Sequence, residues 1–389
     1  MRAAAAITGI GETEYSKNSG MSDKALQLQA ITRAVADAGL KPHDVDGFIP
    51  SSIGPGLTAE DFVDNMGTPD LRFSVTLHIG GASGIAGIQD AAMAVASGVA
   101  NHVVVVSGRN GSSMHRISHA QAARGIQAPH RQHMVSMEFE GIYGANVPMQ
   151  FYALIAQRHM HLYGTTSEHL GAVAVTMRRH AGMNEKAIMR APITIDDHQA
   201  SRMITTPFHL FDCCIETDGA TAVVVSSAER AADARRRPAR ILGIAEGHPD
   251  SPSSTATRVD HGRVGIAKAA PRAFAMAGLT PDDLKLAMFY DPFTFIPIYT
   301  LENLGIVGPG EGGPFVAEGN IGLGGKLPVN THGGLHSQAH SQSGLNHVAE
   351  AVKQLRGTAG EAQVVDPDPC VVTGMGDFGN GGVMLLSAR

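Results

Sequence analysis

The stretch "LHIGGASGIAGIQDAAMAVASG" at 77–98 has the residue types of a catalytic loop that leads into a helix. Small residues, among them Gly80, Gly81 and Ser83, crowd the turn, and an alanine-rich helix is expected to follow. A loop this bare lets a substrate approach backbone N–H groups at a helix start. It holds no strong nucleophile, because Ser83 stands where serine normally caps a helix. His78 precedes the loop and could face the same site, although a histidine at a strand end is usually structural.

The three cysteines do not supply the missing nucleophile. Cys213, Cys214 and Cys370 are too few and wrongly spaced for a disulfide framework or a CxxC zinc site. Cys213 and Cys214 also lie far from both the bare loop and the C-terminal glycine-rich loop in the order of the motifs, so we expect them to be buried and inert. No metal site is predicted in this chain.

The elements that must position the loop form an internal repeat. "AVADAGLKPHDV" (34–45) recurs without a gap as "AFAMAGLTPDDL" (273–284). Each copy is typical of a helix that ends at Ala-Gly-Leu and is followed by a turn into a strand. "ASGIAGIQDAAMAVASG" (82–98) is similar to "QSGLNHVAEAVKQLRG" (342–357), and a buried strand is expected after each. The sequence therefore predicts an α/β protein with a duplicated core.

The repeat also divides the chain. Alternating strands and helices predict mostly parallel sheets, which bind ligands at the carboxyl ends of their strands. We assign 1–110 with 211–236 to an N-terminal half and 237–389 to a C-terminal half. The segment 111–210 has no counterpart and is interpreted as an inserted loop domain with a helix at 148–164. Such an insertion usually builds the substrate pocket, but a lid or a dimer surface is equally compatible with it.

The composition excludes several classes of function. The chain has 389 residues, 43% of them hydrophobic, and a formal net charge of −6. This charge gives no attraction to nucleic acid or to an anionic membrane, and no apolar run approaches the ~20 residues of a membrane span. The N-terminus is typical of a first strand rather than of a signal peptide, and no G-x-G-x-x-G fingerprint follows it. We expect a cytoplasmic protein without a redox cofactor.

Several motifs together resemble the thiolase superfamily. They are "DCCIETDGATAVVVSSAERA" (212–231), "NTHGGLHSQAH" (330–340), "QLRG" (354–357) and the glycine-rich end "GDFGNGGVMLLS" (376–387). The chain is most similar to the lipid-transfer-protein branch, which is related to sterol-carrier-protein thiolases. The resemblance implies a thiolase fold with two βαβαβαββ halves in five layers, α-β-α-β-α, and an inserted loop domain.

The residues at the catalytic positions depart from those of a thiolase. A thiolase carries its acyl group on a cysteine of the first loop, and that position falls at Gly81 here. The second thiolase cysteine falls near Asp377. The activating histidine is kept as His340, whereas Tyr290 of "YDPFT" stands where thiolases have the histidine or asparagine of the oxyanion motif. Covalent acyl transfer needs a nucleophile, so ordinary thiolysis is excluded.

The resemblance instead implies the chemistry of cysteine-less side-chain aldolases, which act in steroid and aromatic-acid degradation. A base deprotonates the β-hydroxyl of a β-hydroxyacyl-CoA, the Cα–Cβ bond breaks to release an aldehyde or ketone, and the acyl-CoA enolate is protonated. We assign His340 as the base and Tyr290 as the proton donor, because an unperturbed histidine titrates near ~6.5 and a tyrosine near ~10. The reverse assignment stays open, as do His332 and His336 as the base.

Further residues are expected to complete the site. The oxyanion and substrate loops are assigned to Gly80, Gly81, Ser83, Asn330 and Gly379. Backbone donors in these loops would stabilise the enolate, and Asn330 would fix its loop through side-chain hydrogen bonds. The supporting residues are expected to be His78, Asp291 and Asp377.

Two functions of other classes also stay open. The chain could be a catalytically silent thiolase-fold subunit, because the cysteine is missing, with Tyr290 as a core residue whose hydroxyl is tethered. It could also be an acyltransferase that uses an unusual nucleophile such as Ser83. The presence of both Tyr290 and His340 favours the aldolase.

The resemblance implies partners as well. Thiolase folds bury their central sheets in a two-fold dimer, so we expect a homodimer. Relatives in the aldolase group associate with a small OB-fold and zinc-ribbon protein that completes the acyl-CoA site, so we expect a heterotetramer. The zinc would belong to that partner, and this chain would bind no cofactor beyond the CoA of its substrate.

Overall fold

Hydrogen bonds join nine strands into one mixed sheet in the order β3-β2-β4-β7-β1-β8-β11-β10-β9. The computed structural model describes residues 3–51, 56–114, 140–145, 147–251, 254–340, 343–376 and 379–389. The strands are β1 (Ala5–Glu12), β2 (Gly47–Pro50), β3 (Phe73–Ser74), β4 (His102–Asn110), β7 (Asp218–Ser227), β8 (Ala239–Gly247), β9 (Leu286–Phe289), β10 (Cys370–Met375) and β11 (Gly381–Ser387). A small separate sheet pairs β5 (Met203–Thr205) with β6 (Phe208–His209).

Helices cover and separate the two halves of the large sheet. They are α1 (Asp23–Ala38), α2 (Ala59–Met66), α3 (Ser83–Ala96), α6 (Pro148–Tyr163), α7 (Ser167–Gly182), α8 (Ile195–Ala200), α9 (Ala228–Ala231), α10 (Gly265–Ala277), α11 (Phe295–Asn303), α12 (Gly312–Ala317), α13 (Gly334–Ser337) and α14 (Leu345–Arg356). None of the described helices combines the length and the apolarity that crossing a membrane requires.

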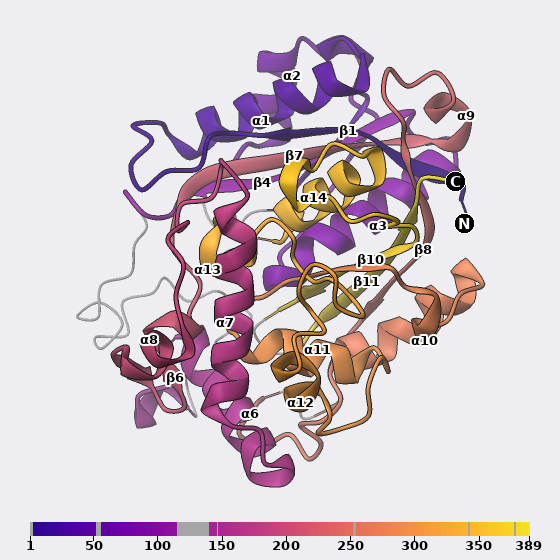
Figure 1. Cartoon of the computed structure of the whole chain (residues 1–389). Helices are drawn as coiled ribbons and strands as arrows, with labels where there is room; N and C mark the ends of the chain where they lie inside the picture. The colour runs from indigo at the N-terminus through magenta and orange to yellow at the C-terminus, as the bar shows by residue number, and fades with distance from the viewer. Residues whose placement is uncertain are drawn as a thin grey trace.

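Three buried clusters define five layers, which follow one another from top to bottom in Figure 1. The first cluster packs α1 and α2 on β2, β4 and β7. The second buries α3 and α14 between strands of both halves. The third packs α10 and α11 on the outer face of β8 to β11. Because each layer buries one apolar face of the next, the predicted α-β-α-β-α arrangement is confirmed.

The strand order repeats the duplication that the sequence predicts. The N-terminal half has the order β2-β4-β7-β1 and the C-terminal half the order β9-β10-β11-β8. Each strand of one half therefore occupies the same position in the sheet as its counterpart in the other half. The N-terminal half adds β3 beside β2, whereas the C-terminal half has only a single bridge there, between Ala287 and Val329. The chain turns away directly after this bridge, because Asn330 adopts a positive φ of 50°. Among its described residues, the C-terminal half therefore has one strand fewer than the βαβαβαββ pattern.

The repeated helices end as expected. Gly39 and Gly278 cap α1 and α10 in the left-handed conformation, with φ values of 79° and 69°. Each is followed by a 3₁₀ turn, Pro42–Asp44 or Pro281–Asp283, and then by the next strand. Glycine is favoured at such a cap because it adopts positive φ without steric cost.

Glycines of the first strand in each half let the next helix lie against the sheet. A Cβ at Gly9 would lie 2.2 Å from the carbonyl oxygen of Ala34 in α1. A Cβ at Gly243 of β8 would lie 2.1 Å from the equivalent oxygen of Ala273 in α10. The two halves thus share a close helix–strand contact that any larger residue would prevent.

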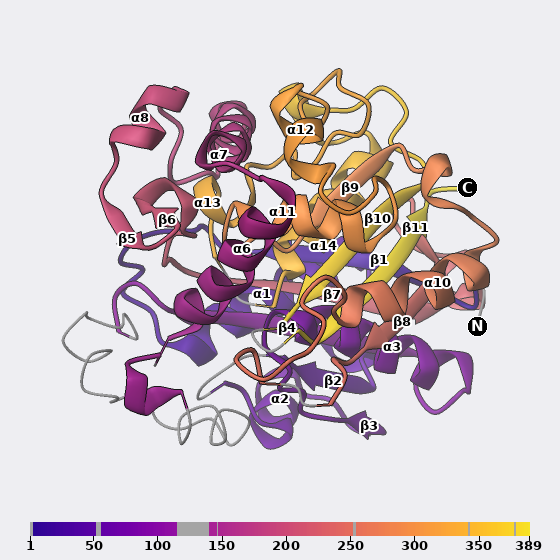
Figure 2. The ribbon, with the colours of Figure 1, turned by 90° about the horizontal axis from the view of Figure 1, so that it is seen from below.

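The described part of the segment between β4 and β7 consists mainly of α6, α7 and α8, which lie beside the C-terminal half (Figure 2). The helix expected at 148–164 is confirmed as α6. Helix α7 packs against α12 and α13, and Tyr152 of α6 lies in the same buried cluster as Phe293. This segment therefore abuts the loop that follows β9.

Candidate active site

The Tyr290 ring fills the space that a side chain at position 81 would need. Tyr290 follows β9 directly and is 7% exposed. A Cβ at Gly81 would lie 2.1 Å from its Cε1 atom and 2.3 Å from its Cζ atom, and a Cβ at Gly344 would lie 3.0 Å from its Cδ2 atom. Two loops, one before α3 and one before α14, thus enclose the ring between glycines. A cysteine at position 81 and this orientation of Tyr290 exclude each other.

Tyr290 and His340 are in direct contact. The Tyr290 Oη lies 3.2 Å from Nε2 of His340, and the other ring nitrogen of His340, Nδ1, lies 3.3 Å from Sγ of Cys214. Burial, and then the nearby positive charge of Arg109, lowers the pKa of His340 to about 3. The imidazole is therefore neutral at pH 7 and keeps a lone pair that can accept a proton, but it is a weaker base than the ordinary imidazole on which its assignment as the base rested.

Cys214 is not where the sequence analysis places it. Both cysteines of the pair are partly buried, as expected, but Cys214 is at the centre of the site rather than far from it. Burial raises the pKa of the Cys214 thiol far above its ordinary value, so the sulfur stays protonated. The order of motifs along the chain did not reveal this contact. Cys214 lies just before β7, and β7 pairs with β4 and β1 in the middle of the sheet, which brings Cys214 close to His340.

Arg109 is a charged site residue that the sequence analysis missed. It lies at the carboxyl end of β4, opposite Gly219 of β7. Burial lowers the pKa of its guanidinium, while the nearby Glu216 and Tyr290 oppose that shift. A charged residue at the end of an otherwise apolar strand, in "VVVVSGR", is the signal that could have identified it.

Asp291 organises a cluster of histidines directly behind Tyr290. Its carboxylate is fully buried and lies 3.0 Å from Nδ1 of His336 and 2.9 Å from Nε2 of His347. It also accepts a hydrogen bond from the backbone N–H of Leu335. Burial alone would raise the pKa of Asp291, but the bonds to His336 and His347 lower it well below its ordinary value. The carboxylate is thus ionised and fixes the loops on both sides of it.

Asn330 holds the end of β9 from the other side. Its side-chain amide donates to the carbonyl oxygen of Phe289 at 2.8 Å, and its Oδ1 accepts from the N–H of Phe289 at 2.7 Å. These two bonds replace the backbone hydrogen bonds that a further strand beside β9 would make, at the position that β3 holds in the N-terminal half. Asn330 therefore orients the backbone that carries Tyr290, and it does so from a buried position.

His332 and His336 are both buried in the same region. Both ring nitrogens of His336 are engaged, one with Asp291 and the other with the carbonyl oxygen of Asp212. His332 is 1% exposed, and burial followed by the proximity of His347 lowers its pKa well below the ordinary value. Of the three candidate bases, His340 is the one whose ring nitrogen lies at hydrogen-bonding distance from Tyr290 Oη.

The bare loop forms a 3₁₀ turn, Gly80–Ala82, that runs into α3. Gly80 has a φ of 62°, and α3 begins without a side-chain cap. The Ser83 hydroxyl is 1% exposed and accepts a hydrogen bond from the N–H of Ile79 at 2.9 Å. Its oxygen therefore closes the loop on itself rather than facing a substrate. His78 is partly buried in the segment that leads into this turn.

The C-terminal glycine-rich loop contacts the 3₁₀ turn through Gly376 rather than through Gly379, the residue expected from the sequence. A Cβ at Gly376 would lie 2.4 Å from the carbonyl oxygen of Ile79. Gly379 instead lies against Arg258 and accepts a hydrogen bond from the N–H of Gly265 at the start of α10. Asp377 lies outside the described residues. The structure thus brings Gly81, Tyr290, Asp291, Asn330 and His340 together.

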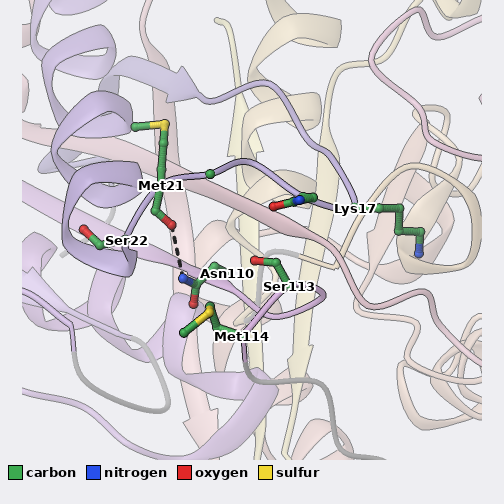
Figure 3. Close-up of a pocket in the computed structure, with 8 residues that line it drawn as sticks. Lys17, Met21, Ser22, Asn110, Ser113 and Met114 are labelled. Carbon is green, nitrogen blue, oxygen red and sulfur yellow. Dashed lines mark hydrogen bonds between the residues drawn. The ribbon is translucent and has the colours of Figure 1, made fainter.

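A cavity of about 560 Å³ opens beside the carboxyl end of β4 (Figure 3). It is lined by Lys17, Asn18, Gly20, Met21, Ser22, Asn110, Ser113 and Met114. The side chain of Asn110 donates to the carbonyl oxygen of Met21 across it. Asp218 ties its two walls together by accepting hydrogen bonds from Ser19 and Ser113. The cavity lies one residue along β4 from Arg109.

In the part of the chain that the structure describes, no three histidine, cysteine or carboxylate side chains are grouped so that they could share a metal ion. The histidines around Asp291 hydrogen bond to protein atoms instead.

Comparison with family models and known proteins agrees with this arrangement. Residues 3–207 match the model for the thiolase N-terminal domain, and residues 247–388 match that for the thiolase C-terminal domain-like family. The chain is 42% identical over 363 residues to a steroid side-chain-cleaving aldolase of Thermomonospora curvata, covering 92% of this chain and 91% of that protein. It is 43% identical over 360 residues to the 17-hydroxy-3-oxo-4-pregnene-20-carboxyl-CoA lyase of Mycobacterium tuberculosis, covering 91% and 92%.

Solved structures place the fold in the same group. A structure described as an Ltp2-ChsH2(DUF35) aldolase superimposes with a TM-score of 0.90 at 39% identity, covering 100% of this chain and 99% of that chain. Human mitochondrial 3-ketoacyl-CoA thiolase superimposes with a TM-score of 0.71 at 16% identity, covering 99% of both chains, and shows the shared fold. The chain therefore belongs to the thiolase superfamily, in the group that contains the steroid side-chain-cleaving aldolases.

Proposed function

We propose that this protein is a carbon–carbon lyase that cleaves a β-hydroxyacyl-CoA by a retro-aldol reaction. The observation that carries the proposal is the placement of Tyr290. Its ring occupies the volume that the acyl-carrying cysteine of a thiolase would need at Gly81, and its hydroxyl lies 3.2 Å from His340 Nε2. The site has therefore exchanged a nucleophile for a pair of proton-transfer groups.

The pair accounts for every proton of the reaction. Neutral His340 accepts the proton of the β-hydroxyl at Nε2, the Cα–Cβ bond breaks, and the β-carbon leaves as a ketone or aldehyde. Tyr290 donates its hydroxyl proton to Cα of the acyl-CoA enolate. The resulting phenolate then takes the proton from His340 across their shared hydrogen bond. One turnover thus restores both side chains without a covalent intermediate.

Two features stabilise the negative charge that forms during cleavage. Arg109 lies near Tyr290, and its positive charge would offset negative charge that forms there during cleavage. Helix α3 begins without a side-chain cap two residues after Gly81, which lies against the ring, so the positive end of its dipole is near the place where an enolate oxygen would be bound. Asp291 and Asn330 act indirectly, since they hold the backbone on either side of Tyr290.

The substrate class follows from the chemistry and from the relatives. A substrate such as the 17-hydroxy-3-oxo-4-pregnene-20-carboxyl-CoA named for the mycobacterial relative carries a hydroxyl on the carbon β to the thioester, as this mechanism requires. We propose a steroid or aromatic β-hydroxyacyl-CoA of this kind. By analogy with the complex named in the structural match, we propose a homodimer that binds a small DUF35-type partner of OB-fold and zinc-ribbon architecture in a heterotetramer.

The test is product analysis without added CoA. The purified chain, with and without a co-expressed DUF35-type protein, is incubated with this steroid thioester and with an aryl β-hydroxyacyl-CoA. Mass spectrometry is expected to detect a ketone or aldehyde together with a shortened acyl-CoA. Products that form only when free CoA is added would indicate thiolysis. No product in any arm would favour a silent subunit.

A further inference from the structure

Cys214 contacts the side of His340 that faces away from Tyr290. The Cys214 Sγ lies 3.3 Å from Nδ1, while Tyr290 Oη lies 3.2 Å from Nε2. The imidazole is therefore held at both nitrogens, and the thiol is the group that contacts the nitrogen away from Tyr290.

The backbone around Cys214 joins the two loops that carry the reactive pair. The N–H of Cys214 donates to the carbonyl oxygen of Pro292 at 2.9 Å, two residues after Tyr290. The N–H of Ile215 donates to the carbonyl oxygen of Leu335 at 3.0 Å. The hydroxyl of Thr217 accepts the N–H of His340 at 3.1 Å. The position of the sulfur relative to His340 is thus fixed by the chain on both sides of it.

Only two hydrogen-bonding patterns fit a thiol, a neutral imidazole and a phenol in this row. In one, the thiol donates to Nδ1 and Nε2–H donates to the phenol oxygen. In the other, the phenol donates to Nε2 and Nδ1–H donates to the sulfur. A phenol is a much stronger donor than a thiol, and an imidazole lone pair is a better acceptor than a phenol oxygen. The second pattern is therefore favoured.

We propose that Cys214 is a positioning residue that holds His340 in the Nδ1–H tautomer, because its sulfur accepts a hydrogen bond from Nδ1–H. The histidine lone pair is thereby kept on Nε2, on the side of Tyr290. This inference rests on the proposed function for its catalytic consequence, but the tautomer itself is a property of the resting protein. The arrangement follows the general logic of a base that is oriented by a third group.

The role explains why a neutral thiol suits this position. A carboxylate would stabilise the protonated imidazole and raise the pKa of His340, which would hinder return of the proton to Tyr290. A protonated thiol instead selects the tautomer without adding charge. Burial supports this by keeping the Cys214 sulfur protonated and His340 neutral.

The experiment is nitrogen-15 NMR of the histidine rings in the resting full-length protein, with His340 assigned from the signals that His340→Gln removes. The wild type is expected to show a protonated Nδ1 and an unprotonated Nε2. Cys214→Ala is expected to move the population toward the Nε2–H tautomer and to lower kcat roughly 2- to 10-fold, the factor that one hydrogen bond contributes, with KM unchanged. Cys214→Ser, whose hydroxyl also accepts, is expected to restore part of both.

Cys213→Ala is the matched control, because the Cys213 thiol faces the carbonyl oxygen of His209 instead. It is expected to leave the His340 signals unchanged. An unprotonated Nδ1 in the wild type would overturn the inference, as would a Cys214→Ala protein with unchanged tautomer and unchanged kcat. If the protein cleaves no thioester but the NMR result is as expected, the proposed function fails while the role of Cys214 in setting the tautomer stands.

Discussion

The two halves of this molecule share their topology but contribute opposite things to the site. Strands β2 and β9 hold the same place in the two halves, and so do the loops before α3 and α14. In the N-terminal half, β2 ends at Pro50 and the loop before α3 offers glycine and backbone. In the C-terminal half, β9 leads into Tyr290 and Asp291, and the loop before α14 follows His340.

The difference shows how a duplicated fold can lose one reaction and acquire another. The N-terminal loop supplies space, because Gly81 has no side chain to oppose the Tyr290 ring. The C-terminal half supplies the two proposed proton-transfer groups, Tyr290 and His340, and the buried network that holds them. The site thus depends on the space at Gly81 in the N-terminal half and on the side chains of Tyr290 and His340 in the C-terminal half. Substitutions in either half should therefore have different effects.

The largest effect is expected from Tyr290→Phe. The change keeps the ring that fills the Gly81 space and removes the proton donor, so kcat should fall about 10²- to 10⁴-fold, the range for one acid–base group. Steady-state assays of β-hydroxyacyl-CoA cleavage measure it. Tyr163→Phe, at an exposed tyrosine of α6, is the matched control. A Tyr290→Phe enzyme of normal kcat would assign the tyrosine to packing alone.

The next effect concerns stability between pH 7 and pH 5. Burial lowers the pKa of His180 to about 4, and burial together with His347 lowers that of His332 well below its ordinary value. The unfolded chain binds protons at these residues near pH 6.5 and the native protein does not, so stability falls as pH decreases through this window. Each histidine should cost about 2 kcal/mol, and His340, whose pKa is lowered to about 3, adds a similar cost, so the three together should cost about 6 kcal/mol.

Urea unfolding at the two pH values measures this loss. His332→Asn should remove about a third of it, whereas His248→Asn, at an exposed histidine, should remove none. The ionised Asp291 does not contribute in this window, because its lowered pKa matters only below about pH 4. A His332→Asn protein with the wild-type pH dependence would show that the buried histidines of this half do not resist protonation.

Gly81→Ala tests the void itself. A methyl group there would lie 2.1 Å from Tyr290 Cε1 and 2.4 Å from the carbonyl oxygen of Met375, so the ring must move. Overpacking of this kind costs about 1–3 kcal/mol of folding free energy, and kcat should fall with it. Thermal unfolding and cleavage assays measure both. Gly182→Ala, which meets only ordinary contacts, should affect neither, and an unaffected Gly81→Ala protein would refute the steric argument.

The smallest effect is expected from Ser83→Ala. The hydroxyl accepts one loop hydrogen bond from Ile79, so its loss should cost about 1 kcal/mol of stability and less than about tenfold in kcat. Intact-protein mass spectrometry during turnover should detect no acyl adduct. Abolished activity together with an adduct on the wild-type protein would instead make Ser83 a nucleophile and assign chemistry to the N-terminal half.

The sequence predicts the fold well because its repeat and glycine caps are local signals. The helices that end at Gly39 and Gly278 were expected from a shared motif and are confirmed. The missing strand at Val329 was not foreseen, because it depends on Asn330 and its bonds to Phe289, which the sequence does not express as a pattern. The thiolase superfamily was identified from motif order and is confirmed.

The site could be predicted only as far as motifs placed its residues. Tyr290 and His340 were named from their motifs, and the structure brings them into contact, while their roles as acid and base stay predictions. Arg109 was missed because it is placed by the pairing of β4 with β7. Cys214 was missed because it is placed by a hydrogen bond to Pro292, which is distant in the sequence. Such contacts arise from the tertiary fold, and no local pattern encodes them.

The central claim is that Tyr290 and His340 act as one proton-transfer unit in place of a nucleophile. A double-mutant cycle with Tyr290→Phe and His340→Gln, measured as kcat for β-hydroxyacyl-CoA cleavage, tests it most directly. If the two share protons across their hydrogen bond, the double variant should be no slower than the slower single variant within about threefold, since groups that act as a unit are non-additive. Losses that multiply, or a double variant with wild-type activity, would contradict the account.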